Sequence, residues 1–235
     1  MEYSISLALY DFLPGLFTGI ALFFIAQMVR RADTRFTTLA FAGGGLVLLA
    51  GLLKATWKLI IAVGGPEILL LSELMFPLMA PGFTLVAFAV WGAIRTLNNK
   101  AAPNNLWLIA SVLIVVAALA AFANTVVLGT VRGYFPIFLG LASISNVSLS
   151  VMLIAESIRR KRFDLAGLFF VNIAMVFALQ PLAAMPEMSI AMHWFEQTLT
   201  SAGAATFAVA GYLMMIDVGV DVTIDVVDHS RMAPA

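Results

Sequence analysis

The sequence contains no cysteine and has few charged residues. Without cysteine, the chain can form neither disulfides nor thiolate metal sites. Charged residues make up 11% of the 235 residues, against about 25% in soluble domains, and the formal net charge of zero argues against a nucleic-acid partner. Hydrophobic residues make up 62%, and the mean hydropathy is +1.02. This composition predicts that most of the chain contacts lipid or other apolar helices.

Long apolar segments account for this composition. About 20 apolar residues are enough for a helix to cross the hydrocarbon core of a bilayer. The segments predict an all-α, polytopic integral membrane protein, with a seven-transmembrane helix bundle over residues 1–216 and an acidic tail over 217–235. Residues 1–6 lack the basic region of a signal peptide, so we expect the first segment to remain as a helix. The predicted spans are 6–29, 36–62, 68–94, 106–129, 134–157, 164–184 and 190–216.

Basic residues are concentrated in alternate connections between the predicted spans, whereas the other connections hold only Arg132. Because basic loops remain in the cytoplasm, this pattern predicts that the N-terminus is outside and the C-terminus is cytoplasmic. The plasma (inner) membrane is the expected location. The acidic tail could rest on the last basic connection or be solvated. The basic residues are Arg30, Arg31, Arg35, Arg95, Lys100, Arg159, Arg160, Lys161 and Arg162.

Two pairs of predicted spans resemble each other. The first and fifth spans end alike, at 28–31 and 157–160, and the third and seventh share similar stretches at 88–92 and 207–211. Because many transporters are built from internal repeats, these similarities raise the hypothesis of a 3+1+3 parallel repeat.

Small residues and prolines mark special points within the spans. Gly15 and Gly19 have the small-xxx-small spacing that allows close helix contact. Proline removes a backbone hydrogen bond, so Pro77 and Pro81 predict a kink in the third span, and the Gln180–Pro181 pair predicts one in the sixth.

Ionisable side chains inside the apolar spans indicate a functional site, because a charge at such depth is costly unless it is paired or hydrated. Lys54 and Lys58 are four residues apart and share a helix face with Trp57. We expect Lys54 to pair with Glu73 or Glu196. Two alternatives remain open: Lys58 could extend to the headgroups, and a buried pair could serve only to fix helix register.

With the predicted orientation, nearly all strongly polar residues of the spans lie in the outer half of the bundle. Such convergence from several helices predicts a charged and aromatic pocket there. Asn146 and the serines around it form a second polar group, deeper in the fifth span, which could join helices or line a cavity. The candidate ligand-binding residues are Asp11, Lys54, Trp57, Lys58, Glu73, Asn124, Gln180, His193, Trp194, Glu196 and Gln197.

This pocket favours a transporter or ligand-binding sensor for a small amphiphilic or anionic molecule. One alternative is a membrane-embedded enzyme acting on lipid, with His193 as acid–base and Glu196 or Glu73 orienting it. Another is an accessory subunit of a membrane complex, whose buried charges specify assembly. A protein partner at the cytoplasmic face and a homo-oligomer are further hypotheses.

No cofactor is predicted. Asp11, Glu73, Glu196 and His193 could form a carboxylate metal site, but two nearby lysines would repel the cation, so no metal is expected. Seven spans with an outer N-terminus are a layout similar to that of rhodopsins, whose retinal is attached to a lysine of the seventh helix. The span 190–216 has no lysine, which argues against covalent retinal.

Overall fold

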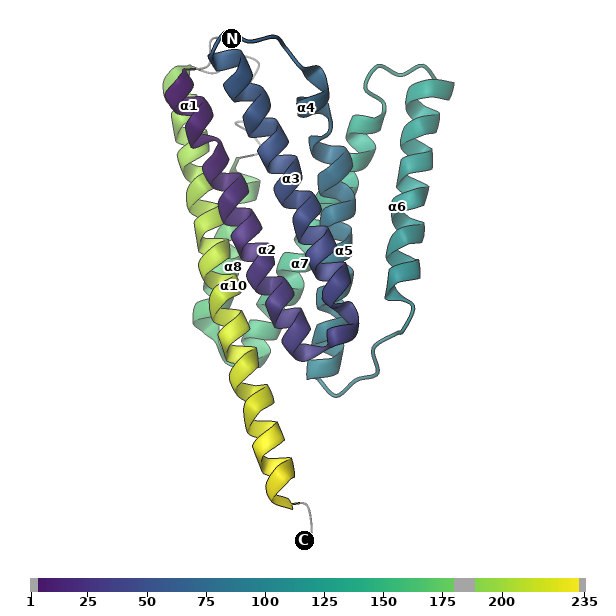
Figure 1. Cartoon of the computed structure of the whole chain (residues 1–235), viewed down its shortest axis with the longest axis vertical. Coiled ribbons are helices and arrows are strands. Elements are labelled where there is room, and N and C mark those ends of the chain that lie inside the picture. The colour runs from purple at the N-terminus through teal and green to yellow at the C-terminus, as the bar shows by residue number, and fades with distance from the viewer. Residues whose placement is uncertain (1–3, 180–188, 233–235) are drawn as a thin grey trace.

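The computed structural model describes residues 4–179 and 189–232, the last twelve of these by backbone alone. In this part of the chain all regular structure is helical, and the helices run up and down in one bundle (Figure 1). Six segments are long and apolar enough to cross a membrane, and α8 is a shorter apolar helix. By the length and composition of its helices, the chain is therefore a multi-pass membrane protein.

The helix boundaries lie within a few residues of the predicted spans wherever the structure describes them. The exception is the last helix, α10, which continues without a break past residue 216 into the predicted tail. The helices are α1 (Ile5–Tyr10), α2 (Phe12–Ala32), α3 (Thr37–Ala62), α4 (Leu69–Glu73), α5 (Met75–Leu97), α6 (Leu106–Phe122), α7 (Tyr134–Arg159), α8 (Phe163–Ala178) and α10 (Ile190–Met232), with short turns at Thr34–Phe36 and Ala123–Val127.

Six of the helices form a closed ring. In order around it, α2 packs on α3, α3 on α5, α5 on α7, α7 on α8, α8 on α10, and α10 back on α2. Helix α6 lies outside this ring, against α5 and α7, and stands apart from the rest in Figure 1. The 3+1+3 repeat stays a prediction.

Three spans depart locally from regular α-helix near the same end of the bundle, which we call the amino-terminal end because Ile5 lies there. The first span breaks at Asp11, between α1 and α2, and the third at Leu74, between α4 and α5. The third interruption is a π-helical turn at Ala123–Val127, after α6. Pro77 explains the second break, because its nitrogen cannot donate a bond to the carbonyl of Glu73. The Gln180–Pro181 pair lies outside the described residues.

Glycines bring three helices of the ring into close contact. Gly15 of α2 faces Gly51 of α3, and a Cβ atom added at Gly15 would lie 3.6 Å from the Gly51 backbone. Nearer the start of α3, a Cβ at Gly43 would lie 2.5 Å from the carbonyl oxygen of Gly82 in α5. Close backbone contact of this kind is a normal way for membrane helices to associate. It confirms that the glycine at position 15 mediates helix contact.

The Gly43→Ala substitution is expected to lower the stability of the bundle. The added methyl group would collide with the α5 backbone at Gly82 and with Val86, and overpacking of this kind costs about 1–3 kcal/mol. The midpoint of thermal unfolding in detergent measures the effect. Gly45→Ala is the matched control, because a Cβ there meets nothing within 4 Å. Equal midpoints for the two variants would contradict this packing.

Candidate functional site

An ion pair joins the break in the first span to α3. The Nζ atom of Lys58 lies 2.5 Å from Oδ2 of Asp11, and the two side chains are only 17% and 8% exposed. Asp11 is the residue at which α1 ends and α2 begins. The interruption therefore places a carboxylate where it neutralises one of the two lysines of α3.

Lys54 lies one helical turn deeper in α3 and has a different partner. Its Nζ atom is 4.4 Å from the centroid of the Trp57 ring, within the range of a cation–π contact. Among the described residues, no carboxylate lies within ion-pair distance of Lys54. Lys54 is partly buried. Its partner in the described part of the chain is therefore an aromatic ring, whereas the carboxylate of Asp11 is paired with Lys58.

The expected pairing of Lys54 with Glu73 or Glu196 is corrected by this geometry. Glu196 lies beside His193 on α10, with 3.8 Å between Oε2 and Nδ1 of the histidine. Glu73 ends the short helix α4, where it is partly exposed and makes no ion pair among the described residues. The carboxylate of Asp11 is bound by Lys58.

Aromatic rings bring the start of α10 to the same end of the bundle. The rings of Tyr10 and Trp194 are 5.5 Å apart, and Tyr10 directly precedes Asp11. Gln197, one turn farther along α10, is buried. At this end of the bundle the described contacts pair Asp11 with Lys58, Lys54 with Trp57, Tyr10 with Trp194, and His193 with Glu196.

The remaining candidates are Glu73, described above, Asn124 and Gln180. Asn124 closes its own loop: its Nδ2 donates to the carbonyl of Gly133 at 2.9 Å, and its Oδ1 accepts a bond from Thr130 at 3.3 Å. Its polar groups are therefore used locally. Gln180 lies outside the described residues.

The opposite, basic end of the bundle holds a network that the sequence interpretation missed. Glu156 is 2% exposed and accepts bonds from Arg159 at 2.6 Å, Arg160 at 2.8 Å and Asn98 at 3.2 Å. The spacing of Glu156 from its two arginines, three and four residues, is the signal that could have revealed it. The network joins the end of α5 to the end of α7.

The same network fastens α10 where it leaves the bundle. Asp217, the first residue of the predicted tail, contacts Arg162 at 2.5 Å and Arg160 at 3.3 Å. On the other side of α10, Nη1 of Arg31 donates to the carbonyl of Met215 at 2.6 Å. Asp217 therefore contacts the last basic connection, and the two alternatives for the rest of the tail stay predictions.

A separate charged group connects the first basic turn to α5. Asp33 accepts bonds from Arg35 at 2.6 Å and from Thr96 of α5 at 2.8 Å. The Arg35 guanidinium, more than any other group, holds the pKa of the Asp33 carboxyl below its ordinary value. Asp33 therefore stays ionised at mildly acidic pH and keeps these contacts.

Comparisons of the chain with protein-family models, with curated proteins and with solved structures find no match.

Proposed function

We propose that the chain binds a small amphiphilic anion at Lys54, beside Trp57, near the amino-terminal end of the bundle. The observation that carries this proposal is the partly buried Lys54 ammonium group, which has an aromatic ring and no carboxylate beside it among the described residues. Lys58 is held by Asp11, so Lys54 is the cation available to a ligand.

Electrostatics and burial favour an anion with an apolar body. Lys54 lies eight residues from the end of α3, or about 12 Å along the helix axis. A charge at this depth is stabilised when an opposite charge joins it. The anionic head of the ligand contacts Lys54 Nζ, and the apolar body packs against the rings of Trp57, Tyr10 and Trp194. With the predicted orientation, the site is reached from outside the cell.

A sensor is the role that the last helix favours. Helix α10 carries Trp194 at the end of the bundle where the ligand binds and Asp217 at the basic end, and it continues to Met232. At 43 residues it is about 64 Å long. A ligand that shifts the start of α10 would therefore move the segment that extends beyond the bundle (Figure 1).

A transporter is the second candidate, favoured by the interrupted helices. The breaks at Asp11 and Leu74 lie at the same end of the bundle as Lys54. Discontinuous helices commonly form the binding sites of transporters, because freed backbone groups and helix ends contact the substrate. Uptake of the bound anion into vesicles containing the purified protein would distinguish this role from that of a sensor.

The Lys54→Met variant tests the binding site. We use 2-naphthalenesulfonate as the probe, because it combines an anionic head with an aromatic body. Loss of a charged hydrogen-bond partner costs about 1.5–3 kcal/mol, so the dissociation constant should rise by about 10- to 150-fold. Titration calorimetry on the purified protein measures it.

Lys100→Met is the matched control, because Lys100 is an exposed lysine in a connection at the basic end. It should leave the affinity for the probe unchanged. A Lys54→Met protein that is folded and binds the probe as tightly as the parent chain would contradict the proposal.

A further inference from the structure

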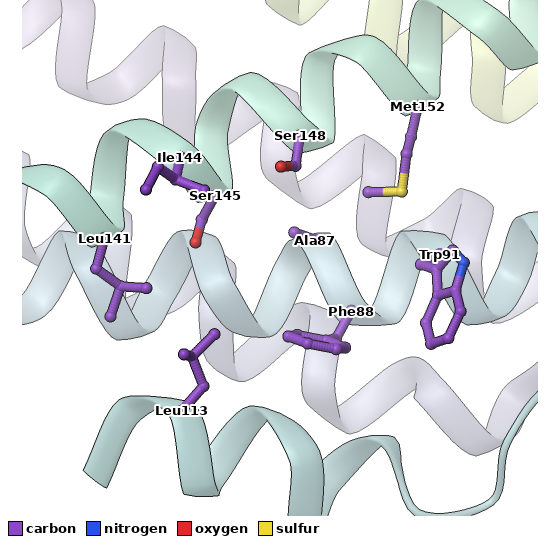
Figure 2. Close-up of a pocket in the computed structure, with 9 residues that line it drawn as sticks. All are labelled: Ala87, Phe88, Trp91, Leu113, Leu141, Ile144, Ser145, Ser148 and Met152. Carbon is purple, nitrogen blue, oxygen red and sulfur yellow. The ribbon is translucent and has the colours of Figure 1, made fainter. Parts of the chain in front are cut away.

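A second site lies between α6 and the ring of helices. A cavity of about 260 Å³ lies between α5, α6 and α7. Phe88 and Trp91 of α5, Leu113 of α6, and Ser148 and Met152 of α7 line it, as Figure 2 shows. A water molecule occupies about 30 Å³ in the liquid, so the cavity has room for several methylene groups. Its walls are almost entirely apolar.

Two serines of α7 illustrate the two roles predicted for this polar group, which are joining helices and lining a cavity. The Ser145 hydroxyl is 2.9 Å from that of Thr84, which in turn donates to the carbonyl of Ala80, so Ser145 joins α7 to α5. Ser148 is exposed and lines the cavity (Figure 2). Ser145 lines the cavity as well, so the otherwise hydrocarbon surface of the cavity carries two hydroxyl groups, one of them bonded to Thr84.

A cation marks the end of the cavity nearest the basic loops. Arg95 lies one turn beyond Trp91 on α5, with its guanidinium carbon 5.6 Å from the Trp91 ring. Its Nε donates to the carbonyl of Ala101 at 2.8 Å. In the described part of the chain no carboxylate pairs with Arg95, whereas Arg35 and Arg160 both contact one. Arg95 can therefore receive an anion from outside the protein.

We propose that this cavity binds one acyl chain of an anionic phospholipid, with the lipid phosphate at Arg95. The cavity lies within membrane-spanning helices, so its occupant comes from the bilayer. Basic side chains at the surface of a membrane attract anionic headgroups. Hydrocarbon packs against Phe88, Leu113 and Met152, while the guanidinium lies one turn nearer the headgroups.

Two other grooves on the bundle can be compared with this cavity. One lies between α2 and α3 and the other between α2 and α10, with volumes of about 160 and 320 Å³. Both are lined by apolar side chains, glycines and one tyrosine, and no basic residue lines either. No basic residue lines the cavity beside α6 either, so the anionic headgroup is assigned there by the contact of Arg95 with the ring of Trp91, which is one of its lining residues.

Native mass spectrometry of the full chain in detergent tests this site. The probes are phosphatidylglycerol and phosphatidylcholine with identical acyl chains, added at equal concentration. One basic residue near a membrane surface is worth about a fivefold preference for an anionic lipid, so the parent chain should retain about five times more phosphatidylglycerol. Arg95→Gln should retain the two lipids equally.

Filling the cavity should reduce binding of both lipids. Ser148→Phe introduces a ring into the cavity, and Leu113→Trp fills it from α6 if the first variant fails to fold. The matched controls are Ser143→Phe, an exposed position of α7 that does not line the cavity, and Lys100→Gln, a basic residue beyond Arg95. Both controls should bind lipid as the parent chain does.

Three results would overturn the proposal. The first is a phosphatidylglycerol preference that survives in Arg95→Gln. The second is an equal loss of preference in Lys100→Gln, which would show that only the general charge of this end of the bundle matters. The third is unchanged lipid retention in a folded variant with a filled cavity.

Discussion

Replacing Glu156 with glutamine is expected to lower the free energy of unfolding by about 3 kcal/mol, because removing one member of a buried charge network leaves its partners uncompensated. Glu156 is 2% exposed and accepts bonds from Arg159, Arg160 and Asn98. The glutamine amide keeps the shape of the side chain but turns donor hydrogens toward guanidinium groups that are donors themselves. Arg160 keeps its contact with Asp217, which limits the loss.

Thermal unfolding in detergent measures this effect. At about 2–4 °C per kcal/mol, the midpoint should fall by about 6–12 °C. Glu67→Gln is the matched control, because Glu67 is an exposed glutamate in the connection before α4. Its midpoint should remain that of the parent chain. A Glu156→Gln midpoint equal to that of the control would show that the network contributes nothing to stability.

Asp11→Asn is expected to have the second large effect on stability. The substitution removes the carboxylate that lies 2.5 Å from Lys58, at a position where both side chains are largely buried. Breaking such a pair by removing one partner costs about 3 kcal/mol. The variant should therefore unfold at a clearly lower temperature than the parent chain.

A double variant separates the loss of the attraction between Asp11 and Lys58 from the cost of leaving Lys58 charged and buried without a carboxylate. Replacing a buried ion pair by apolar or neutral groups of similar size is often close to neutral. Asp11→Asn combined with Lys58→Met should therefore recover most of the stability that Asp11→Asn loses. A double variant as unstable as the single one would contradict this view of the pair and indicate that Asp11 acts mainly through the break between α1 and α2.

Much of the fold could be predicted from the sequence. Hydropathy alone located the spans, because a membrane helix needs an apolar run of nearly fixed length. The structure begins α6 at residue 106 and α7 at residue 134, as predicted. The position of α6 outside the ring could not be predicted, since apolar residues that face lipid and those that face another helix look alike in sequence.

The candidate site was predicted in part. Counting residues along each helix gives the position of a residue along the helix axis. This count correctly placed Lys54, Lys58 and Asp11 at one end of the bundle. It does not give the rotation of each helix or a break in it. Asp11, at the junction of α1 and α2, pairs with Lys58, so the pairing expected for Lys54 was wrong.

The network at the basic end was missed for a different reason. Arginines at the end of a span are the usual signal of orientation, and Arg159 and Arg160 were interpreted only in that way. Glu156 stands at the same level, where a carboxylate is ordinarily solvated. The spacing of Glu156 from the two arginines indicates the ion pairs. It does not predict the burial of Glu156, which results from the packing of α7 against the end of α5.

Native mass spectrometry of the gently purified protein, with Lys54→Met beside it, tests whether Lys54 holds a ligand. We predict a reproducible small bound mass on the parent chain, released as an anion with an apolar body, and its loss from a folded Lys54→Met protein. A bound mass of the same size on both proteins would place the ligand elsewhere. Absence of any bound mass, together with an unfolded Lys54→Met protein, would mean that Lys54 only holds helices together.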